Sequence, residues 1–293
     1  MKKLSLLAAF VAGLVITGCS HDDPETSFVV NPSHPDYEDT ITISFSRAFN
    51  YSIEPFQSRT RAGLSDVATH LDVWIIQGDD VTEVHQLSDD ADFGIVSLKV
   101  NRQKEYTMKA VAHKCSAAAT MTDGVVSFPE GELKHTLYAC HTFKPDTISA
   151  ELPVNMQRIV GSFKLITTDS IPSRVYTMRF CIKNSPQQFN TADMTGIAKA
   201  DRTVEFSNFA RKADGTNTFT IYVMPETMTA QHGYDIEVTG LKQNGDVVES
   251  RTFPSVQIRA GYRSQYQGAF FVTRSAGFAF CFDDWNDLPT VDF

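Results

Sequence analysis

The sequence has little of what catalytic and nucleic-acid-binding proteins depend on. Only 2 of its 293 residues are Trp and only 5 are Cys, and 26 basic residues face 35 acidic ones. No run of Lys and Arg is present, so the chain lacks the clustered positive charge that binds phosphate backbones, which excludes a general nucleic-acid binder. The eight His include no pair at the i, i+4 spacing of a metalloprotease helix.

Motifs for phosphate binding and acyl transfer are also missing. The chain contains no Gly-rich phosphate loop and no G-x-S-x-G nucleophile elbow. The nearest approach to a metal set is His113 and Cys115 with Cys140 and His141, but its spacing is not that of a zinc site, so we interpret these as ordinary strand residues. We therefore expect no enzymatic activity, no metal and no cofactor.

Aromatic residues and short alternating runs are what the sequence does contain. Aromatics make up 11% of the chain, including 21 Phe and 9 Tyr, and such residues favour half-buried, pleated surfaces. Apolar and polar residues alternate over short stretches that are separated by Gly, Asn and Asp, as in Asp123-Gly124 and Asn244-Gly245. The pattern predicts an all-β protein built from sandwiches.

The strand-like runs fall into two series with a break at Pro145. The first series includes 41–45, 71–76, 95–100 and 106–112, and the second includes 156–166, 176–182, 218–224, 234–241, 247–253, 265–272 and 278–282. Helix is expected only at 65–69 and in parts of 184–200. The predicted division is a signal peptide at 1–18, an acidic Pro-containing tether at 19–39, an N-terminal β-sandwich at 40–147 and a C-terminal β-sandwich at 148–293.

The N-terminus has the pattern of a lipoprotein export signal. Two lysines precede the apolar stretch Leu4–Ile16, which is too short to cross a bilayer as a helix. It ends in Ile16-Thr17-Gly18-Cys19, which matches the bacterial lipobox, so we predict that Cys19 is acylated and becomes the first residue. The alternative is an ordinary secretory signal that contains an incidental Cys.

Four other cysteines and one basic segment are candidate sites. An exported protein can oxidise Cys115, Cys140, Cys181 and Cys281, and pairing 115 with 140 and 181 with 281 would respect the predicted division. Buried free thiols are the alternative. In the polar segment 59–62, Arg-Thr-Arg-Ala, a trypsin-like protease could cut after Arg61, the alternative being an uncut connector.

Taken in order, these features resemble one protein family. They are the lipobox, the acidic residues after Cys19, the Thr-Arg-Ala segment, the strand-like run 71–76, the run 157–163, the run 257–268 and Trp285. This layout resembles the FimA/Mfa-type fimbrial superfamily of Bacteroidota, which builds the type V pilus, and within it the FimB-type anchor lipoproteins.

The resemblance implies two transthyretin-like β-sandwich domains in an exported lipoprotein. In polymerising members a protease cuts after an Arg, the leader strand leaves, and a strand of the next subunit fills the groove by β-augmentation. Arg61 is the matching position here. Anchor members keep their lipid and end the fibre at the membrane. Residues 286–293 include Pro289 and two Asp and make a poor donor strand, which favours an anchor or accessory subunit.

The predicted function is thus that of a surface lipoprotein that anchors, assembles or accompanies a pilus through strand exchange and adhesion. Its expected location is the outer membrane, facing the exterior, because the acidic cluster after Cys19 resembles the surface-export signal of Bacteroidota lipoproteins. Its expected partners are other fimbrial subunits. The alternative is a glycan-binding lipoprotein of a polysaccharide-uptake system, in which exposed aromatics such as Trp74 or Trp285 would stack on sugars. Core packing is the favoured interpretation of Trp74, because it sits inside an apolar strand.

Overall fold

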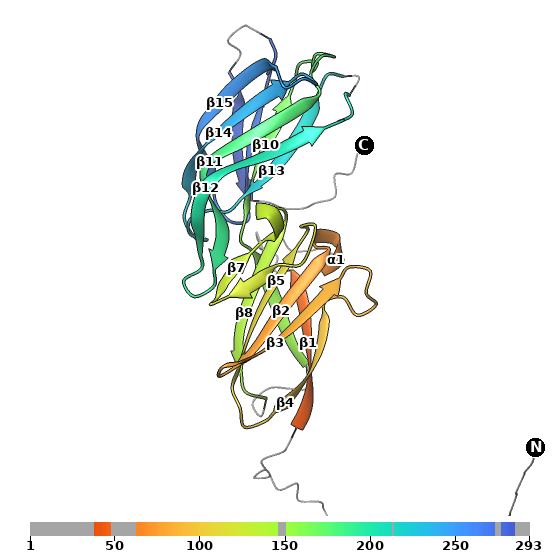
Figure 1. The fold of residues 1–293 in the computed structure, drawn as a ribbon, viewed down its shortest axis with the longest axis vertical. Helices are drawn as coiled ribbons and strands as arrows, with labels where there is room; N and C mark the ends of the chain where they lie inside the picture. Colours follow the sequence, from red (N-terminus) through yellow and green to blue (C-terminus); the bar gives the residue numbers. More distant parts are fainter. Residues whose placement is uncertain (1–37, 48–62, 146–150, 213, 273–276, 285–293) are drawn as a thin grey trace, which may run out of the picture. The chain divides into compact units, whose positions relative to one another are not determined.

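The structure is a computed structural model that describes residues 38–47, 63–145, 151–212, 214–272 and 277–284. Residues from Glu38 onward form one compact unit, and almost all of its elements are strands (Figure 1). Within the described part of the chain, no helix has the length and apolar character needed to span a bilayer. The elements are β1 (Glu38–Arg47), α1 (Leu64–Val67), β2 (His70–Gln77), β3 (Asp80–Leu87), β4 (Ile95–Asn101), β5 (Tyr106–His113), β6 (Thr120–Thr122), β7 (Val125–Ser127), η1 (Pro129–Gly131), β8 (Thr136–Phe143), β9 (Glu151–Arg158), β10 (Gly161–Thr167), β11 (Thr177–Asn190), β12 (Thr195–Ser207), β13 (Asn217–Val223), β14 (His232–Leu241), β15 (Val247–Ile258), β16 (Tyr262–Gly268) and β17 (Ala279–Asp284).

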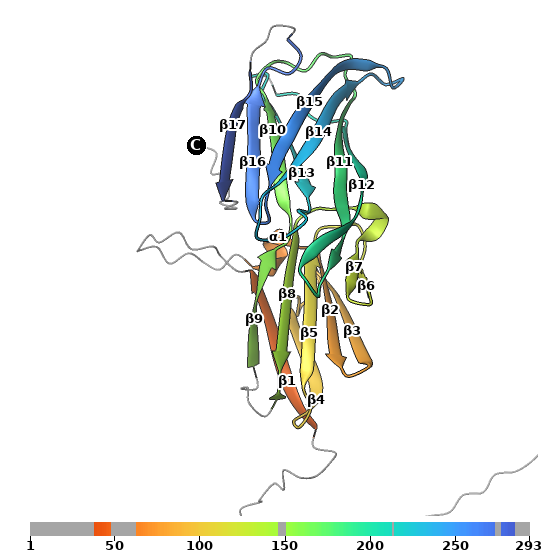
Figure 2. The same ribbon diagram turned by 90° about the vertical axis from the view of Figure 1, so that its left-hand side faces the viewer.

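The first sandwich is a seven-stranded sheet folded over on itself. Its strand order is β3-β2-β5-β8-β9-β1-β4, and one core contains side chains from both ends of this order, such as Leu71 and Met108 from one half and Ile43 and Val96 from the other. The half formed by β3, β2, β5 and β8 therefore covers the half formed by β9, β1 and β4. Figure 2 shows the two layers from the side.

Strand β2 is buried on both faces, which a simple alternating pattern does not predict. Leu71, Val73 and Ile75 point into the core of the first sandwich. Trp74, on the opposite face, is 1% exposed and belongs to a separate cluster that includes Val126 of β7 and Phe189 of β11. This second layer of packing fixes the β6–β7 hairpin against β2.

The second sandwich packs two sheets around its own core. One sheet has the order β13-β10-β16-β17, and the other runs β15-β14-β11-β7-β6 with β12 also paired to β11. Phe163 of β10 and Phe180 of β11 meet at the centre with ring centroids 6.2 Å apart. The hairpin β6–β7 thus joins the second sandwich although it precedes β8 and β9 in the chain. Its turn uses Asp123 and Gly124, both with positive φ, as expected for a two-residue hairpin loop.

The structure confirms the all-β sandwich prediction and the helix near 65–69, and it corrects one expectation. The segment 184–200, in which helix was expected, forms most of the long hairpin β11–β12. An irregularity in the pairing between Ile182 and Ser185, where Asn184 has a φ of 50°, hides the strand period. The boundary between 147 and 148 stays a prediction; β9, which follows it, pairs with β1 and β8 of the first sandwich.

Candidate strand-exchange site

Strand β1 lies inside the first sandwich, between two partners that follow it in the sequence. It pairs antiparallel with β4, from Glu38 opposite Asn101 to Ser44 opposite Ile95. On its other side it pairs parallel with β9, from Thr42 opposite Glu151 to Arg47 opposite Met156. Removing β1 would therefore expose two sheet edges that face each other across an empty slot.

The side chains of β1 alternate as a half-buried strand requires. Ile41, Ile43 and Phe45 are 2%, 0% and 7% exposed and point into the core, while Thr42 and Ser44 point outward. Burying a large apolar side chain contributes about 1.5–3 kcal/mol, so the three together hold β1 in its slot by several kcal/mol. The same residues would leave an apolar groove if β1 departed.

Polar contacts fix both ends of β1. At the start, the Arg102 Nε donates a hydrogen bond of 2.8 Å to Asp39 Oδ2, and this bond lowers the pKa of the Asp39 carboxyl below its usual value. At the end, the Ser46 Oγ donates to Asn155 Oδ1 at 3.0 Å and the Phe45 N–H donates to the Gly94 carbonyl at 2.8 Å. These contacts set the register of β1.

The beginning of β4 is held by one buried amide side chain. Gln86, 7% exposed, donates from Nε2 to the Ile95 carbonyl at 2.8 Å, and its Oε1 accepts the Gly94 N–H at 3.0 Å. Gly94 adopts a φ of 88°, close to the Phe45 carbonyl. The edge of the slot that faces β1 is therefore fixed by residues outside β1 as well.

The predicted cleavage position follows β1 directly in the sequence. Arg61 lies outside the described residues, between the end of β1 at Arg47 and the start of α1 at Leu64. A cut there would separate β1 from every other element of the fold. Cys19, the predicted lipid attachment site, and Trp285 also lie outside the described residues.

All four of the cysteines considered for disulfides are free thiols in the structure, as in the alternative of unpaired thiols, and neither possible pair is formed. Cys140 is opposite Lys109 on β5, whereas Cys115 lies two residues beyond the end of β5, at His113. The two thiols therefore lie at different places along the β5–β8 pair, and the structure does not bring them together. Cys181 lies on β11 and Cys281 on β17, in opposite sheets of the second sandwich. Burial raises the pKa of the Cys115 thiol to about 12.

A buried polar cluster on β2 is a feature that the sequence analysis missed. Asp72 is 0% exposed, and its Oδ2 accepts hydrogen bonds from the His113 Nε2 at 2.7 Å and from the Ala119 N–H at 2.8 Å. Its Oδ1 accepts a hydrogen bond of 2.8 Å from the Nδ1 of His85. Burial alone would raise the pKa of Asp72, but these hydrogen bonds outweigh it and lower the pKa. An Asp between Leu71 and Val73 was the signal that could have found the cluster.

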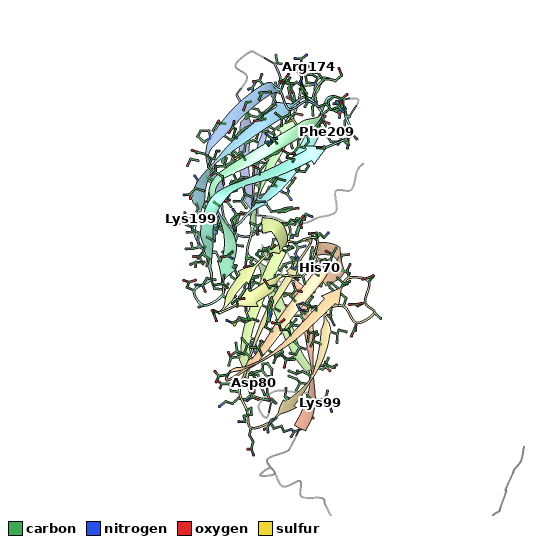
Figure 3. All side chains as sticks on the ribbon, viewed as in Figure 1. His70, Asp80, Lys99, Arg174, Lys199 and Phe209 are labelled. Atoms are coloured by element: carbon green, nitrogen blue, oxygen red, sulfur yellow. The ribbon has the colours of Figure 1, made fainter. Side chains whose placement is uncertain are left out.

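The cluster resembles a catalytic dyad but lacks access to solvent at its centre. The Cys115 N–H donates to the His113 Nδ1, so Nε2 carries the proton that is given to Asp72. His113 is 0% exposed and stacks on His70 with ring centroids 5.1 Å apart; Figure 3 labels His70, at the start of β2. Through Ala119 the carboxylate anchors the segment that leads into the β6–β7 hairpin. We interpret the Asp72 cluster as a structural group that holds the β6–β7 hairpin in place.

The described residues that the sequence offered for metal binding and for stacking on sugars are either separated from one another or buried. His113 and Cys140 lie at separate places along the β5–β8 pair, and no group of three or more His, Cys, Asp or Glu side chains in the described part of the chain is placed to hold a metal ion. Trp74 packs in the interior. Tyr262 and Phe282 stack on each other with planes 6° apart, and the Arg259 guanidinium lies over the Tyr262 ring.

Comparison with known proteins gives structural matches alone. No protein-family model matches the chain, and no curated protein is significantly similar to it. A proposed adhesin from Bacteroides thetaiotaomicron is 11% identical with a TM-score of 0.49, the match covering 84% of this chain and 96% of that one. A proposed polysaccharide-binding protein from the same species is 10% identical with a TM-score of 0.49, covering 78% and 92%. A fimbrial assembly protein from Parabacteroides distasonis is 9% identical with a TM-score of 0.46, covering 85% and 96%.

Proposed function

We propose that this protein is a lipid-anchored subunit of a surface fimbria, which anchors, assembles or accompanies the fibre and has no enzymatic role. Its partners would be other fimbrial subunits, bound by exchange of β-strands, together with the outer membrane, bound through the acyl chains on Cys19. The location would be the outer membrane, on its exterior face. Two or more acyl chains on Cys19 would hold the protein stably in the membrane, since a single acyl chain binds only marginally.

The placement of β1 carries this proposal. A strand that is internal to a sheet, joined to the rest of the fold by a single connection, and preceded by a lipidated Cys is an element that can be removed or retained as a unit. If it is retained, the groove is filled and the lipid stays attached to the fold. If it is cut away after Arg61 and departs, the groove is opened and the lipid is lost from the protein. Retention therefore suits an anchor, and removal suits a polymerising subunit.

The alternative of glycan binding has lost one of its two candidate residues. Trp74 is 1% exposed, so it cannot stack on a sugar ring. Trp285 lies outside the described residues. The described residues include exposed aromatic side chains, Tyr176 and Phe280, but the fimbrial role is the one we propose.

Mass spectrometry of the protein purified from cells tests the proposal. We expect an N-terminal peptide that begins with triacylated Cys19 and, after digestion with a protease specific for Glu, a peptide that runs uncut through Arg61. Accessibility to an externally added protease would show the surface location. A mature N-terminus at Ala62 would replace the anchor assignment by that of a polymerising subunit, and an intact chain confined to the periplasmic side would overturn both.

A further inference from the structure

Strands β8 and β9 pair over a short stretch and then separate, which leaves a seam between them in the first sandwich. Leu137 is opposite Arg158 and Tyr138 is opposite Gln157, and beyond these residues the structure pairs the two strands no further in the described part of the chain. On their other sides β8 is paired to β5 and β9 to β1. The seam is therefore bounded by paired residues at one end and, at the other, by the chain that connects β8 to β9.

A cavity of about 430 Å³ lies at this seam. Ala139 of β8 and Val154 of β9 line its inner part, and both are buried in the core of the first sandwich. Cys140 of β8 and Asn155 of β9 line it as well and are exposed, so the cavity opens on the outward face of the sheet. Its volume falls within the range of about 300–1,000 Å³ that is usual for small-molecule sites.

The hydroxyl of Tyr138 is the polar group that this cavity leaves without a partner. Tyr138 lines the cavity and is 3% exposed, and its hydroxyl makes no hydrogen bond of normal geometry with the described residues. Burial raises the pKa of this hydroxyl, so it stays neutral and is able both to donate and to accept. Since an unpaired buried polar group destabilises the folded state, a ligand hydroxyl or amide would supply what the fold itself does not.

One wall of the cavity comes from the second sandwich. Met194 lies in the turn between β11 and β12 with a φ of 60°, which a bulky side chain rarely adopts. The start of this turn is fixed by Thr191, whose Oγ1 donates to the Gly124 carbonyl and accepts from the Lys109 Nζ, each at 2.7 Å. Unusual backbone conformations of this kind occur preferentially at ligand sites. Here the turn holds the adaptable, apolar side chain of Met194 against the cavity.

We propose that this cavity binds a short neutral saccharide. None of the described residues that line it is Asp, Glu, Lys or Arg, so a charged ligand would find no counterion there. The lining instead presents the amides of Asn155 and Gln157, the imidazole of His141 and the Tyr138 hydroxyl, all of which have both donor and acceptor capacity. Sugar hydroxyls have the same double capacity, and the C–H faces of a sugar ring would pack on the side chain of Met194.

The two closed ends of the seam favour a compact ligand over an extended peptide. A peptide strand lying in the plane of the sheet would meet the paired residues of β8 and β9 at one end. At the other it would meet the connection between Phe143 and Glu151. A short saccharide enters from the outward face and crosses neither boundary.

The site goes beyond the proposed fimbrial role. It uses neither Trp74 nor Trp285, and it requires neither lipidation of Cys19 nor removal of β1. A subunit that carries it would bind a sugar whether it anchors, assembles or accompanies a fibre.

Protection of the Cys140 thiol tests the proposal in the full-length protein, solubilised in a detergent without a sugar headgroup. The neutral probes are glucose, galactose, mannose and N-acetylglucosamine, and glucuronic acid is the charged counterpart of glucose. We expect at least one neutral sugar, at about ten times its dissociation constant, to slow maleimide labelling of Cys140 about 10-fold, because labelling follows the unliganded fraction. Glucuronic acid should give no protection. Cys281, which is exposed on β17, should be labelled at an unchanged rate, and peptide mass spectrometry separates the two thiols.

Two substitutions connect the protection to this cavity. Tyr138→Phe removes a hydroxyl that has no partner in the structure, so the thermal unfolding midpoint should not fall. The dissociation constant of the protecting sugar should nevertheless rise about 2- to 10-fold, as expected for one lost hydrogen bond. Gln157→Leu should weaken binding similarly, whereas Gln243→Leu, at an exposed amide of the β14–β15 turn, is the matched control and should not.

Three results would overturn the proposal. They are no protection by any of the four neutral sugars, equal protection by glucuronic acid, and protection that neither Tyr138→Phe nor Gln157→Leu weakens. Protection by a short peptide of alternating Val and Thr, with none by the sugars, would replace the saccharide by a peptide as the occupant. None of these results bears on the N-terminal mass of the protein, so failure here is distinguishable from failure of the fimbrial role.

Discussion

The Asp72 carboxylate and the His113 imidazole are joined by a hydrogen bond of 2.7 Å, and neither side chain is more than 1% exposed. The pair connects β2 to β5 on the face of the sheet opposite the main core. Because the same carboxylate also accepts the Ala119 N–H, it couples this sheet to the hairpin that continues into the second sandwich.

Replacing Asp72 by Ala should therefore lower the free energy of unfolding by about 3 kcal/mol. The change leaves the His113 Nε2–H and the Ala119 N–H buried without an acceptor, and an unsatisfied buried group costs about 1–3 kcal/mol. Urea denaturation followed by tryptophan fluorescence measures the change, and Trp74 lies beside the site in the sequence. The matched control is Asp79→Ala, in the exposed β2–β3 turn, for which we expect a change within about 0.5 kcal/mol.

The pH dependence of stability should reflect the same carboxylate. The folded state lowers the pKa of Asp72 below 3.8, so the unfolded chain takes up a proton first as the pH falls. The stability that Asp72 contributes is complete above that value and is lost as the pH drops below 3.8 towards the folded pKa. Denaturation midpoints between pH 5 and 2 should fall more steeply for the natural protein than for the Asp72→Ala variant. Equal slopes would contradict the prediction.

A second loss of stability is expected at a higher pH. Burial lowers the pKa of His70 below 6.5, so the folded state favours the neutral imidazole. Its contribution is complete above pH 6.5 and declines as the pH falls below that value. A His70→Gln variant should lack this decline in stability, as measured by denaturation midpoints between pH 8 and 5. It should keep the decline below pH 3.8 that Asp72 causes.

The stability that β1 contributes to the fold should come from its inward-facing side chains. Ile43→Ala removes a fully buried side chain and should cost about 2–5 kcal/mol. Thr42→Ala, on the outward face of the same strand, should cost less than about 1 kcal/mol. A similar loss in both variants, measured by urea denaturation, would mean that the side chains of β1 do not fill the core as the structure has them.

Cleavage after Arg61 should convert β1 into a separately held strand. With the lipidated protein in vesicles, trypsin is expected to cut the chain at that segment while the fold remains on the membrane through the pairing of β1. The Ile43→Ala protein should leave the vesicles several-fold faster after the cut, because fewer contacts hold its strand. Sedimentation of the vesicles separates the two outcomes, and the Thr42→Ala protein serves as the control.

A glycine at the junction of β9 and β10 should not tolerate a side chain. A Cβ on Gly161 would lie 2.5 Å from the Arg259 carbonyl oxygen and 2.9 Å from the Ile258 Cγ2. Gly161→Ala should therefore destabilise the protein by about 1–3 kcal/mol. Gly277→Ala, where a Cβ would meet nothing within 4 Å, should leave the thermal unfolding midpoint nearly unchanged.

The sequence predicted the elements whose burial follows a simple period. β1 and β4 lie where alternation placed them, and the turn at Asp123-Gly124 followed from residues that accept positive φ. β17 also lies near its predicted position, but Phe280, on the face expected to be buried, is 50% exposed. β3 was not predicted because most of its side chains are exposed on both faces, so no hydrophobic period marks it.

Pairing between distant segments could not be predicted from local pattern. The parallel contact of β1 with β9 joins residues more than 100 positions apart, and the contact of β7 with β11 places a hairpin of the first half in a sheet of the second. The Asp72 cluster depends on the same long-range packing: a polar residue on the outward face of β2 became buried only because β6 and β7 cover that face. The local sequence therefore predicts the alternation of a strand, whereas tertiary contacts determine which of its faces is exposed to solvent.

The position of β1 also determines how the protein would bear mechanical load. If, as proposed, Cys19 holds the lipid and the fold carries a fibre, a pull on that fibre reaches the fold through the N-terminal end of β1, along the axis of that strand. The hydrogen bonds to β4 and β9 lie across this axis on both sides, so force would strain both ladders together rather than opening them one bond at a time. Detachment under tension would then be governed by the rate at which the whole strand slides free. The pairing and packing of β1 would therefore set the force that the attachment can withstand.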